Sequence, residues 1–294
     1  MNEFKDRVAV VTGAASGIGF ALSSRFAREG MRIVMSDVEE AALHEAAGRV
    51  CDTGAQVVAV RADVSKAADV ENLANQTYEA FGAVHVLCNN AGVAVSGLIR
   101  ENSLRDWEWV IGVNLWGVIH GLRSFLPRMI EQDTDGHIVN TASIAGIITG
   151  PGMGVYCASK HAVVGLSESL YHELTLMGSK VSVSVLCPAW VKTRISDSDR
   201  NRPEPLSDRR ETSHPLAGLL ENWARTAVSN GISADHVADE VLGAIRDKRF
   251  YILTHSDMTE LIRRRMEGIV DGINPQTAPV PGLTVCRTWH RTNV

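Results

Sequence analysis

Tyr156 and Lys160 place a phenol and an ammonium group four positions apart in the sequence. On a helix, residues at this spacing share one face, so both groups can point into one site. At about 6 Å and an effective dielectric constant of about 20, the lysine cation favours the phenolate by roughly 3 kcal/mol, or about 2 pK units. That change suits the phenol to general acid–base chemistry near neutral pH. Because Tyr-x-x-x-Lys is frequent in helices, the pair gains specificity only from the motif before it.

A glycine-rich segment, residues 12–19, directly follows the apolar run of residues 7–11. The run, the glycines and then Ile18, Leu22 and Phe26 at helical spacing predict a strand, a tight turn and a helix. Such a turn brings backbone close to a ligand, and the new helix offers N–H groups and its positive dipole end to a pyrophosphate. A plain glycine-rich turn is the alternative, but the alternation of elements that follows favours dinucleotide binding.

Strand-like and helix-like segments alternate along the rest of the chain. Further strands are expected at residues 31–36, 56–61, 84–88, 137–141, 181–186 and 250–253. Further helices are expected at residues 39–50, 66–81, 104–130, 155–177, 216–227, 233–246 and 258–270. This order predicts an α/β fold, a doubly wound parallel sheet of Rossmann type with helices on both faces and ligand sites at the C-terminal strand ends. Chemically useful residues follow the strands at those ends: Gly13, Asp37, Asp63, Asn90, Ser143 and Pro188.

A single domain is expected over residues 1–275. Within it, the pattern lapses at about residues 194–230, where the chain is polar and contains prolines. Structureless stretches of this length in compact domains are usually lids or disordered segments. We expect a substrate lid there, in which residues 216–220 and Trp223 close over the substrate, with a permanently docked helix as the alternative. Residues 276–294, rich in prolines and small side chains, are expected to form an extended C-terminal tail.

The composition favours a cytoplasmic globular enzyme. Apolar residues make up 45% and charged residues 21% of the chain, and the net charge is −5. That charge gives no reason to expect nucleic acid or an anionic membrane as a partner, and no secretory segment or bilayer-spanning apolar run is present. The five cysteines contain no Cys-x-x-Cys pair and the ten histidines no His-Glu-x-x-His pair. We therefore expect reduced thiols and no metal site.

Together these motifs resemble the short-chain dehydrogenase/reductase family over about residues 5–271. The resemblance rests on three groups of residues: the glycines of Thr12-Gly13-x-x-x-Gly17-x-Gly19, the segment Asn89-Asn90-Ala91-Gly92, and the four residues Asn114, Ser143, Tyr156 and Lys160. It implies a Rossmann enzyme that moves a hydride between a nicotinamide cofactor and an alcohol or carbonyl. One departure is that the family's Pro-Gly after the sixth strand is Pro188-Ala189 here.

The resemblance also implies a role for each of the four catalytic residues. Tyr156 exchanges a proton with the substrate oxygen, and Lys160 lowers the phenol's pKa and binds the nicotinamide ribose. Ser143 hydrogen-bonds the substrate oxygen and stabilises the charge that develops on it. Asn114 holds a water molecule that links the lysine to solvent. For an isolated serine or asparagine, a local backbone hydrogen bond is the alternative.

Asp37 closes the second strand, where this fold places the acid that binds the adenosine ribose and repels a 2′-phosphate. Phosphate-binding relatives carry a basic residue at positions that hold Ser16 and Val38 here, so we expect NAD rather than NADP. Asp63 and Val64 are expected beside the adenine, with a helix cap as the alternative for Asp63. The expected cofactor contacts are Gly13, Ser16, Gly17, Ile18, Gly19, Asp37, Asp63, Val64, Asn90, Ala91, Gly92, Tyr156, Lys160, Pro188, Val191 and Thr193.

The residues expected around the substrate are apolar and include no fixed cation. They are Val93, Ala94, Val95, Ile144, Ala145, Met153, Trp190 and Val191. They favour an uncharged, hydrophobic secondary alcohol or ketone, with aromatic compounds among the candidates; for any one of them, plain core packing is the alternative. The C-terminal part is loosely similar to bacterial family members that oxidise benzylic alcohols of lignin-derived aryl ethers.

The resemblance implies a homodimer or homotetramer built on the helices that carry Asn114 and Tyr156. The stripe Trp109, Val113, Trp116 and His120 lies on the first of these helices, with core packing as its alternative role. Three other functions are considered: an NADP-dependent carbonyl reductase, a non-catalytic NAD-binding sensor, and an isomerase that uses bound NAD. A sensor usually lacks some of the four catalytic residues, which are all present here.

Overall fold

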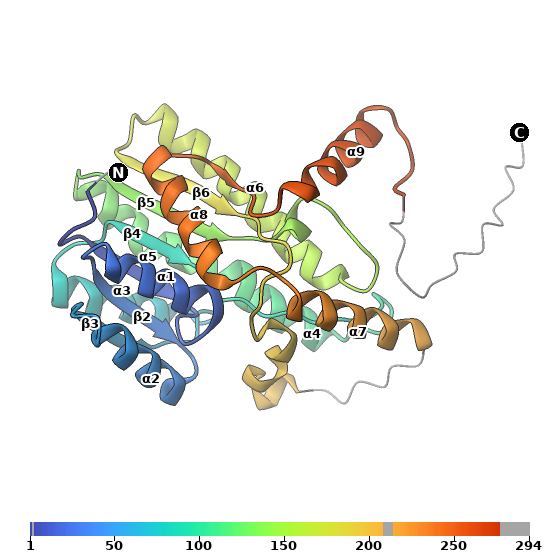
Figure 1. The fold of residues 1–294 in the computed structure, drawn as a ribbon, viewed down its shortest axis with the longest axis horizontal. Helices are drawn as coiled ribbons and strands as arrows, with labels where there is room; N and C mark the ends of the chain where they lie inside the picture. The colour runs from blue at the N-terminus through green and yellow to red at the C-terminus, as the bar shows by residue number, and fades with distance from the viewer. Residues whose placement is uncertain (2, 208–213, 277–294) are drawn as a thin grey trace, which may run out of the picture.

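The computed structural model describes residues 1, 3–207 and 214–276. Its centre is a sheet whose described strands are all parallel and run in the order β3-β2-β1-β4-β5-β6-β7 (Figure 1). The strands are β1 (Val8–Thr12), β2 (Arg32–Asp37), β3 (Val57–Arg61), β4 (Val86–Asn89), β5 (Gly136–Thr141), β6 (Val181–Leu186) and β7 (Tyr251–Ile252). The chain leaves β1 in one direction and β4 in the other, which opens a crevice at their C-terminal ends.

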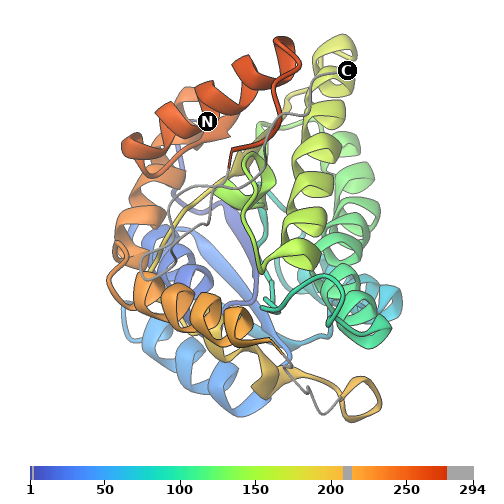
Figure 2. The same cartoon turned by 90° about the vertical axis from the view of Figure 1, so that its right-hand side faces the viewer.

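Helices cover both faces of the sheet (Figure 2). They are α1 (Gly17–Arg28), α2 (Glu40–Cys51), α3 (Ala67–Phe81), α4 (Leu104–Ile111), α5 (Gly117–Glu131), α6 (Gly154–Leu176), α7 (Pro215–Ser229), α8 (Ala234–Asp247) and α9 (Thr259–Val270). Side chains of α1, α2 and α8 pack on one face of the sheet, and those of α3, α5 and α6 pack on the other. Successive residues of β1 alternate between these two cores, as the period of a strand requires.

The predicted fold class is confirmed, and most element ends agree with the sequence prediction within a few residues. The helix expected over residues 104–130 is instead two α-helices joined by a π-helical turn, Gly112–Trp116. Hydrophobic periodicity does not reveal such a turn, because each flanking helix keeps its own apolar pattern and the extra residue changes only the phase between the two patterns. This π-helical turn contains Asn114, one of the four candidate catalytic residues.

The predicted C-terminal elements are present but differ in detail. The last strand holds two residues, and α9 follows a short 3-10 turn, Ser256–Met258. α9 stands apart from the body of the molecule (Figure 1) and none of its residues is buried. The tail expected over residues 276–294 lies outside the described residues except for Gln276.

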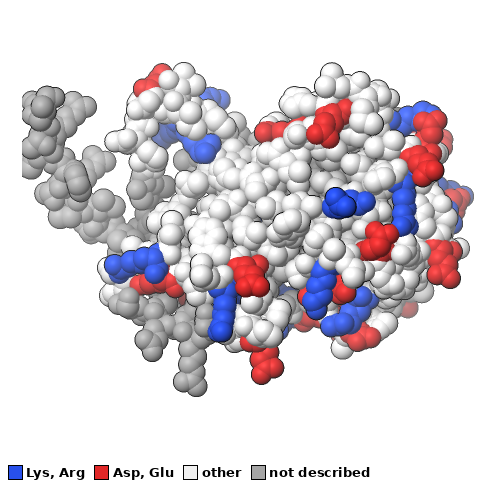
Figure 3. Space-filling view, turned by 180° about the vertical axis from the view of Figure 1, so that it is seen from behind, with Lys and Arg blue, Asp and Glu red and all other residues white. Residues whose placement is uncertain are grey.

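The surface shows no dominant sign of charge on the face in Figure 3, where acidic and basic side chains are intermingled across its described part. Among the described helices, none is both long and apolar enough to cross a membrane. Within the same residues, no cluster of three or more His, Cys, Asp or Glu side chains is arranged to hold a metal ion.

Candidate active site

The turn between β1 and α1 is packed so tightly that glycine is required at two positions. Gly13 has a φ of 65°, and a Cβ on it would lie 2.8 Å from the Cα of Ala91. A Cβ on Gly19 would lie 2.1 Å from the carbonyl oxygen of Gly13. Ser16, the N-cap of α1, makes no side-chain hydrogen bond to the first turn. The backbone therefore comes close to the crevice, and the end of α1 can receive an anion such as a pyrophosphate.

The carboxylate of Asp37, at the end of β2, connects that strand to the glycine-rich turn. Its Oδ2 accepts a hydrogen bond from Ala15 N at 3.0 Å, and its Oδ1 accepts one from Glu39 N at 3.1 Å. Burial raises the pKa of Asp37, although these two N–H groups act in the opposite direction. Each oxygen can accept a further hydrogen bond, which a ribose hydroxyl could supply.

Asn90 fixes the ends of three neighbouring strands. Its Nδ2 donates to Thr12 O at 2.9 Å, and its backbone N donates to Thr12 Oγ1 at 2.9 Å. Its Oδ1 accepts a hydrogen bond from Thr141 Oγ1 at 3.3 Å. The side chain thus ties β1, β4 and β5 together under the crevice, so its amide is used structurally as well as being placed at the candidate site.

Asp63 forms a local turn and not the helix cap considered as its alternative role, because the N-cap of α3 is Lys66 and no side chain caps this helix. Its Oδ1 accepts hydrogen bonds from Ser65 Oγ at 2.7 Å and Ser65 N at 3.1 Å. Its neighbour Val64 is buried, and a Cβ on Gly117 would lie 2.8 Å from the Cγ2 of Val64. Both Asp63 and Val64 also line the crevice, so this turn is compatible with a place beside the cofactor.

The segment after β6 runs back to the glycine-rich turn. A Cβ on Gly17 would lie 3.0 Å from Cγ2 of Thr193, which places Thr193 beside the turn as expected. Ala189 replaces the glycine that the family resemblance implies. It does not have a positive φ, and its N donates to His255 Nδ1 at 3.4 Å. Alanine therefore fits here without backbone strain.

Asn114 and Lys160 are both buried behind Gly92. Asn114 Oδ1 accepts a hydrogen bond from Val93 N at 2.8 Å, and Nδ2 donates to Val93 O and Ser159 Oγ, each at 3.0 Å. Lys160 is 2% exposed and donates from Nζ to the carbonyl oxygen of residue 141 at 2.8 Å. A Cβ on Gly92 would lie 3.4 Å from Asn114 Oδ1 and 3.5 Å from Lys160 Nζ, so the two side chains meet at this glycine.

Tyr156 and Ser143 lie at the entrance to the same site. Lys160 Nζ is 5.6 Å from the centre of the Tyr156 ring, close to the separation expected from the spacing. The Ser143 hydroxyl accepts a hydrogen bond from Ala145 N at 3.1 Å and donates to Pro188 O at 3.3 Å. All four candidate catalytic residues are therefore brought together at the C-terminal ends of the strands.

The shift in the pKa of Tyr156 is opposite in direction to the sequence prediction. Burial raises the pKa of Tyr156 to about 12, even though a hydrogen bond with Ser143 acts to lower it. Burial also lowers the pKa of Lys160 to about 8. The prediction of a lowered phenol pKa was wrong because it counted the attraction between the two charges and omitted the water that both groups lose.

Ser143, Tyr156, Lys160 and the glycine-rich turn line one cleft of about 970 Å³, while Asn114 is fully buried behind its wall. The expected substrate residues Val93, Ala94, Ile144, Ala145, Met153, Trp190 and Val191 line it. Val95 does not belong to this wall: it is 3% exposed and packs in a separate cluster with Trp109, Val110 and Val155. Val93 belongs to the same cluster but also reaches the cleft, whereas Val95 does not.

Several cleft residues were not predicted as site residues. Trp116, assigned above to a packing stripe, is 49% exposed and lines the cleft. Met258 and Leu261, at the start of α9, line it from the far side. Trp223 of α7, which was expected in the lid, also lines the cleft and meets Trp190 edge to face, with ring centres 5.1 Å apart. These residues come from elements distant in sequence, so no local pattern could assign them to a common wall.

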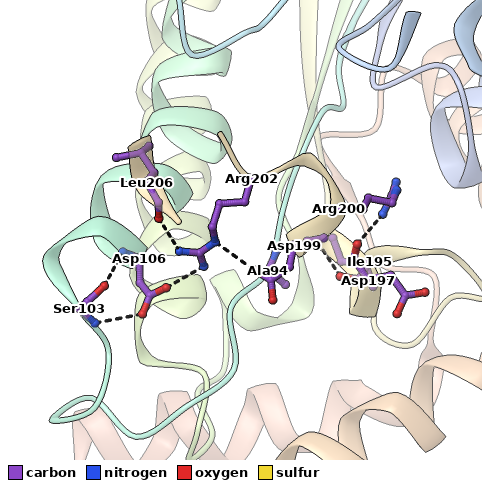
Figure 4. Close-up of polar contacts among 10 residues, drawn as sticks. Ala94, Ser103, Asp106, Ile195, Asp197, Asp199, Arg200, Arg202 and Leu206 are labelled. Carbon is purple, nitrogen blue, oxygen red and sulfur yellow. Dashed lines mark hydrogen bonds and ion pairs between the residues drawn. The ribbon is translucent and has the colours of Figure 1, made fainter. Parts of the chain in front are cut away.

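The described part of the 194–230 segment, residues 194–207 and 214–230, has more regular structure than its composition predicts. It contains two short 3-10 helices, Ile195–Asn201 and Glu204–Leu206, before α7. Arg202 forms an ion pair with Asp106 of α4 (Figure 4). Arg200 donates to the carbonyl oxygens of residues 194 and 197. Ser198 Oγ accepts a hydrogen bond from Ala94 N at 3.1 Å. The first part of the segment is thus attached to the cleft wall at several points.

Comparisons with known proteins give matches over most of the chain. The short chain dehydrogenase family model matches residues 7–204. The CLA biosynthesis dehydrogenase/reductase of Lactiplantibacillus plantarum is 37% identical over 285 residues, covering 96% of this chain and 100% of the relative. The C alpha-dehydrogenase of a Sphingobium species is 31% identical over 288 residues, covering 96% and 91%.

A solved structure is also similar throughout. The crystal structure of a short chain dehydrogenase/reductase from Burkholderia phymatum in complex with NAD has a TM-score of 0.92 and 46% identity, covering 95% of this chain and 99% of that chain. The parallel sheet, the glycine-rich turn and the four clustered residues agree with these matches. The chain therefore belongs to the short-chain dehydrogenase/reductase family of oxidoreductases.

Proposed function

We propose that the protein is an NAD-dependent alcohol dehydrogenase or ketoreductase that acts on a hydrophobic, uncharged secondary alcohol or ketone. The observation that carries this proposal is the meeting of Ser143, Tyr156 and Lys160 in the cleft that the glycine-rich turn also lines. A nicotinamide cofactor accepts or donates the hydride when bound. The protein's own residues bind the reactants, orient them and move the proton.

Proton transfer is the task of Tyr156. During alcohol oxidation the phenolate takes the hydroxyl proton, and during ketone reduction the phenol donates it. Ser143 hydrogen-bonds the same substrate oxygen and stabilises the charge on it. Lys160, when protonated, favours the phenolate by its charge, and it lies close enough to Asn114 for a water molecule to carry protons outwards.

The cofactor contacts fit a dinucleotide. The tight turn and the end of α1 would hold the pyrophosphate, and Asp37 would accept hydrogen bonds from the adenosine ribose. A 2′-phosphate would meet the carboxylate of Asp37, while Ser16 and Val38 supply no positive charge to receive it. The NAD complex of the Burkholderia relative supports the same preference.

The substrate class follows from the cleft wall near Tyr156. Met153, Ile144 and Trp190 present apolar surface, and Trp223 completes an aromatic corner with Trp190. Such a wall favours binding of apolar groups through the hydrophobic effect. An aromatic alcohol is the class that we would test first, and the C alpha-dehydrogenase relative supports that choice.

The 194–230 segment is proposed to act as a substrate lid. It follows Thr193 beside the glycine-rich turn, and its α7 contributes Leu220 and Trp223 to the cleft. Closure over a hydrophobic substrate would exclude water from the path of the hydride. The alternative is that α7 stays docked and only completes the cleft wall. The two roles differ in whether the segment leaves its contacts with the cleft wall.

We also propose that the enzyme is a homodimer or homotetramer. Outside the cleft, the helices expected at the interface expose large apolar side chains, with Leu104 at 85% and Tyr171 at 40% exposure. Sedimentation velocity gives the mass directly. A monomer at micromolar concentration would contradict this assignment.

The proposed reaction is tested by NADH formation. The purified protein is incubated with NAD and a panel of aliphatic and aromatic secondary alcohols, and NADH absorbance is followed. The Tyr156→Phe variant serves as the control for the proposed chemistry. Tight NAD binding without turnover of any alcohol or ketone would instead favour a sensor.

A further inference from the structure

The 194–230 segment reaches the end of the cleft where the adenosine ribose is proposed to bind. Arg200, in the 3-10 helix Ile195–Asn201, lies with its Nε 2.9 Å from Glu39 Oε1. Asn201 Nδ2 donates to the same oxygen at 3.0 Å. Glu39 is separated from Asp37 by one residue, and its N donates to the Asp37 carboxylate. A part of the chain 161 residues away thus contacts the loop that follows β2.

The Arg200 guanidinium is held in one orientation. Its Nη1 donates to Arg194 O and Asp197 O, each at 3.0 Å, while Nε faces Glu39. Figure 4 shows the side chain of Arg200 well separated from that of Arg202. Both Arg200 and Asn201 line the cleft together with Asp37 and Val38. The guanidinium therefore lies at the end of the cleft where the adenosine ribose is proposed to bind, and none of the contacts described for it comes from α1 or β2.

An arginine in this position has a clear chemical consequence. Guanidinium groups bind phosphate strongly and in a defined geometry, and a nearby arginine is how this fold accommodates a 2′-phosphate. Here Arg200 already forms an ion pair with Glu39. Burial acts to raise the pKa of Glu39, but the hydrogen bond from Asn201 and the charge of Arg200 outweigh it, so the pKa of this carboxyl is lowered and it stays ionised.

We propose that Glu39 is a second determinant of NAD selectivity, because it holds Arg200 in an ion pair and so withholds from the ribose site a guanidinium that would bind a 2′-phosphate. The inference rests on the proposed binding of NAD. Asp37 then excludes the phosphate by its own charge, whereas Glu39 acts through a residue of the 194–230 segment.

The test is a direct measurement of dinucleotide binding. Dissociation constants of NADH and NADPH are determined by calorimetry for the unmutated protein, Glu39→Gln and Glu40→Gln. Glu39→Gln keeps the shape of the side chain and removes its charge, so NADPH affinity is expected to increase about tenfold while NADH affinity changes less than about threefold. Glu40→Gln removes an exposed carboxylate one position later and should leave the NADH to NADPH ratio unchanged.

The double variant Glu39→Gln/Arg200→Gln assigns the gain to the arginine. It should bind NADPH as weakly as the unmutated protein. A gain that persists in the double variant would mean that Glu39 acts only by its own charge, and no gain in Glu39→Gln would mean that it has no part in selectivity; either result overturns the inference. If the unmutated protein binds neither dinucleotide, the proposed function fails, and this inference fails with it.

Discussion

The guanidinium of Arg202 lies 2.7 Å from the carboxylate of Asp106, and these side chains are 6% and 0% exposed. The same guanidinium lies over the ring of Trp109, 4.4 Å from its centre. The other oxygen of Asp106 accepts a hydrogen bond from Ser103 N at 3.0 Å, which caps α4. One buried ion pair therefore anchors the 194–230 segment to the helix that forms the side of the cleft.

Asp106→Asn should release this anchor. Removing one partner of a buried pair costs about 3–5 kcal/mol when the other charge is left alone. Arg202 keeps the exposed carboxylate of Asp199, 3.0 Å from its Nε, so we expect a smaller loss. We expect a lower free energy of unfolding in urea and faster tryptic cleavage after Arg194 and Arg200. Asp133→Asn is the matched control, because its pair with Lys180 is exposed and such pairs contribute at most about 1 kcal/mol. Equal effects of the two substitutions would show that Asp106 is no anchor.

Gly19→Ala should abolish cofactor binding. The added Cβ would lie 2.1 Å from the carbonyl oxygen of Gly13, so the turn must shift to admit it. We expect NADH affinity to fall at least about 100-fold, since the pyrophosphate site depends on this backbone. Gly243→Ala in α8 is the control: its Cβ meets nothing within 4 Å, so stability should rise by up to about 1 kcal/mol. Unchanged NADH affinity in Gly19→Ala would argue against binding at this turn.

Tyr156→Phe should remove the proton donor and leave the cofactor site intact. We expect kcat to fall to less than about 1% of that of the unmutated enzyme, in line with general acid–base catalysis, with NADH affinity almost unchanged. Lys160→Ala should lower both, because it also removes the proposed contact to the nicotinamide ribose. Steady-state kinetics and calorimetry separate the two effects. Retention of substantial kcat in Tyr156→Phe would exclude the phenol as the acid–base group.

Alcohol oxidation should accelerate with increasing pH. Oxidation needs the phenolate, and burial places the pKa of Tyr156 at about 12, so the active form remains a minority through the neutral and alkaline range. Because Lys160 favours the phenolate only when protonated and its pKa is lowered to about 8, we expect kcat/KM to rise close to tenfold per pH unit up to about pH 8 and to level off above it. Ketone reduction, which needs the protonated phenol, should lack this rise. A plateau for oxidation that begins near pH 6 would mean that the phenol titrates far lower in the working enzyme.

Asp37→Ala should weaken selectivity between the two dinucleotides. The unmutated enzyme is expected to favour NAD over NADP by about 100-fold in kcat/KM, or about 2.7 kcal/mol. Without the carboxylate, NAD loses its ribose contacts and NADP loses a repulsion, so the gap should close mainly by weaker use of NAD. Equal efficiency with both cofactors in the unmutated protein would contradict the assignment of Asp37.

The parts of the site that the sequence predicted depend on local order. Strands alternate with helices, and each chemically useful residue follows a strand, so Asp37 and Tyr156 could be placed without coordinates. The ion pair of Arg202 with Asp106 joins residues that are 96 positions apart, and the composition of the sequence did not indicate that the two interact. The position of Val95 outside the cleft wall and the pKa of Tyr156 depend on burial, which a spacing of residues does not reveal.

The strand order also has a consequence for how the chain folds during synthesis. β1, β2, β3 and β4 all lie within the first 89 residues, and they form one contiguous half of the sheet, β3-β2-β1-β4. Half of the sheet can thus pair as soon as β4 leaves the ribosome, and this half already contains the glycine-rich turn and Asp37. β5, β6 and β7 then add one after another along the open edge of β4. We expect translation pauses before residue 89 to disturb folding more than pauses after it, because β1 lacks its neighbour β4 until that residue has been synthesised.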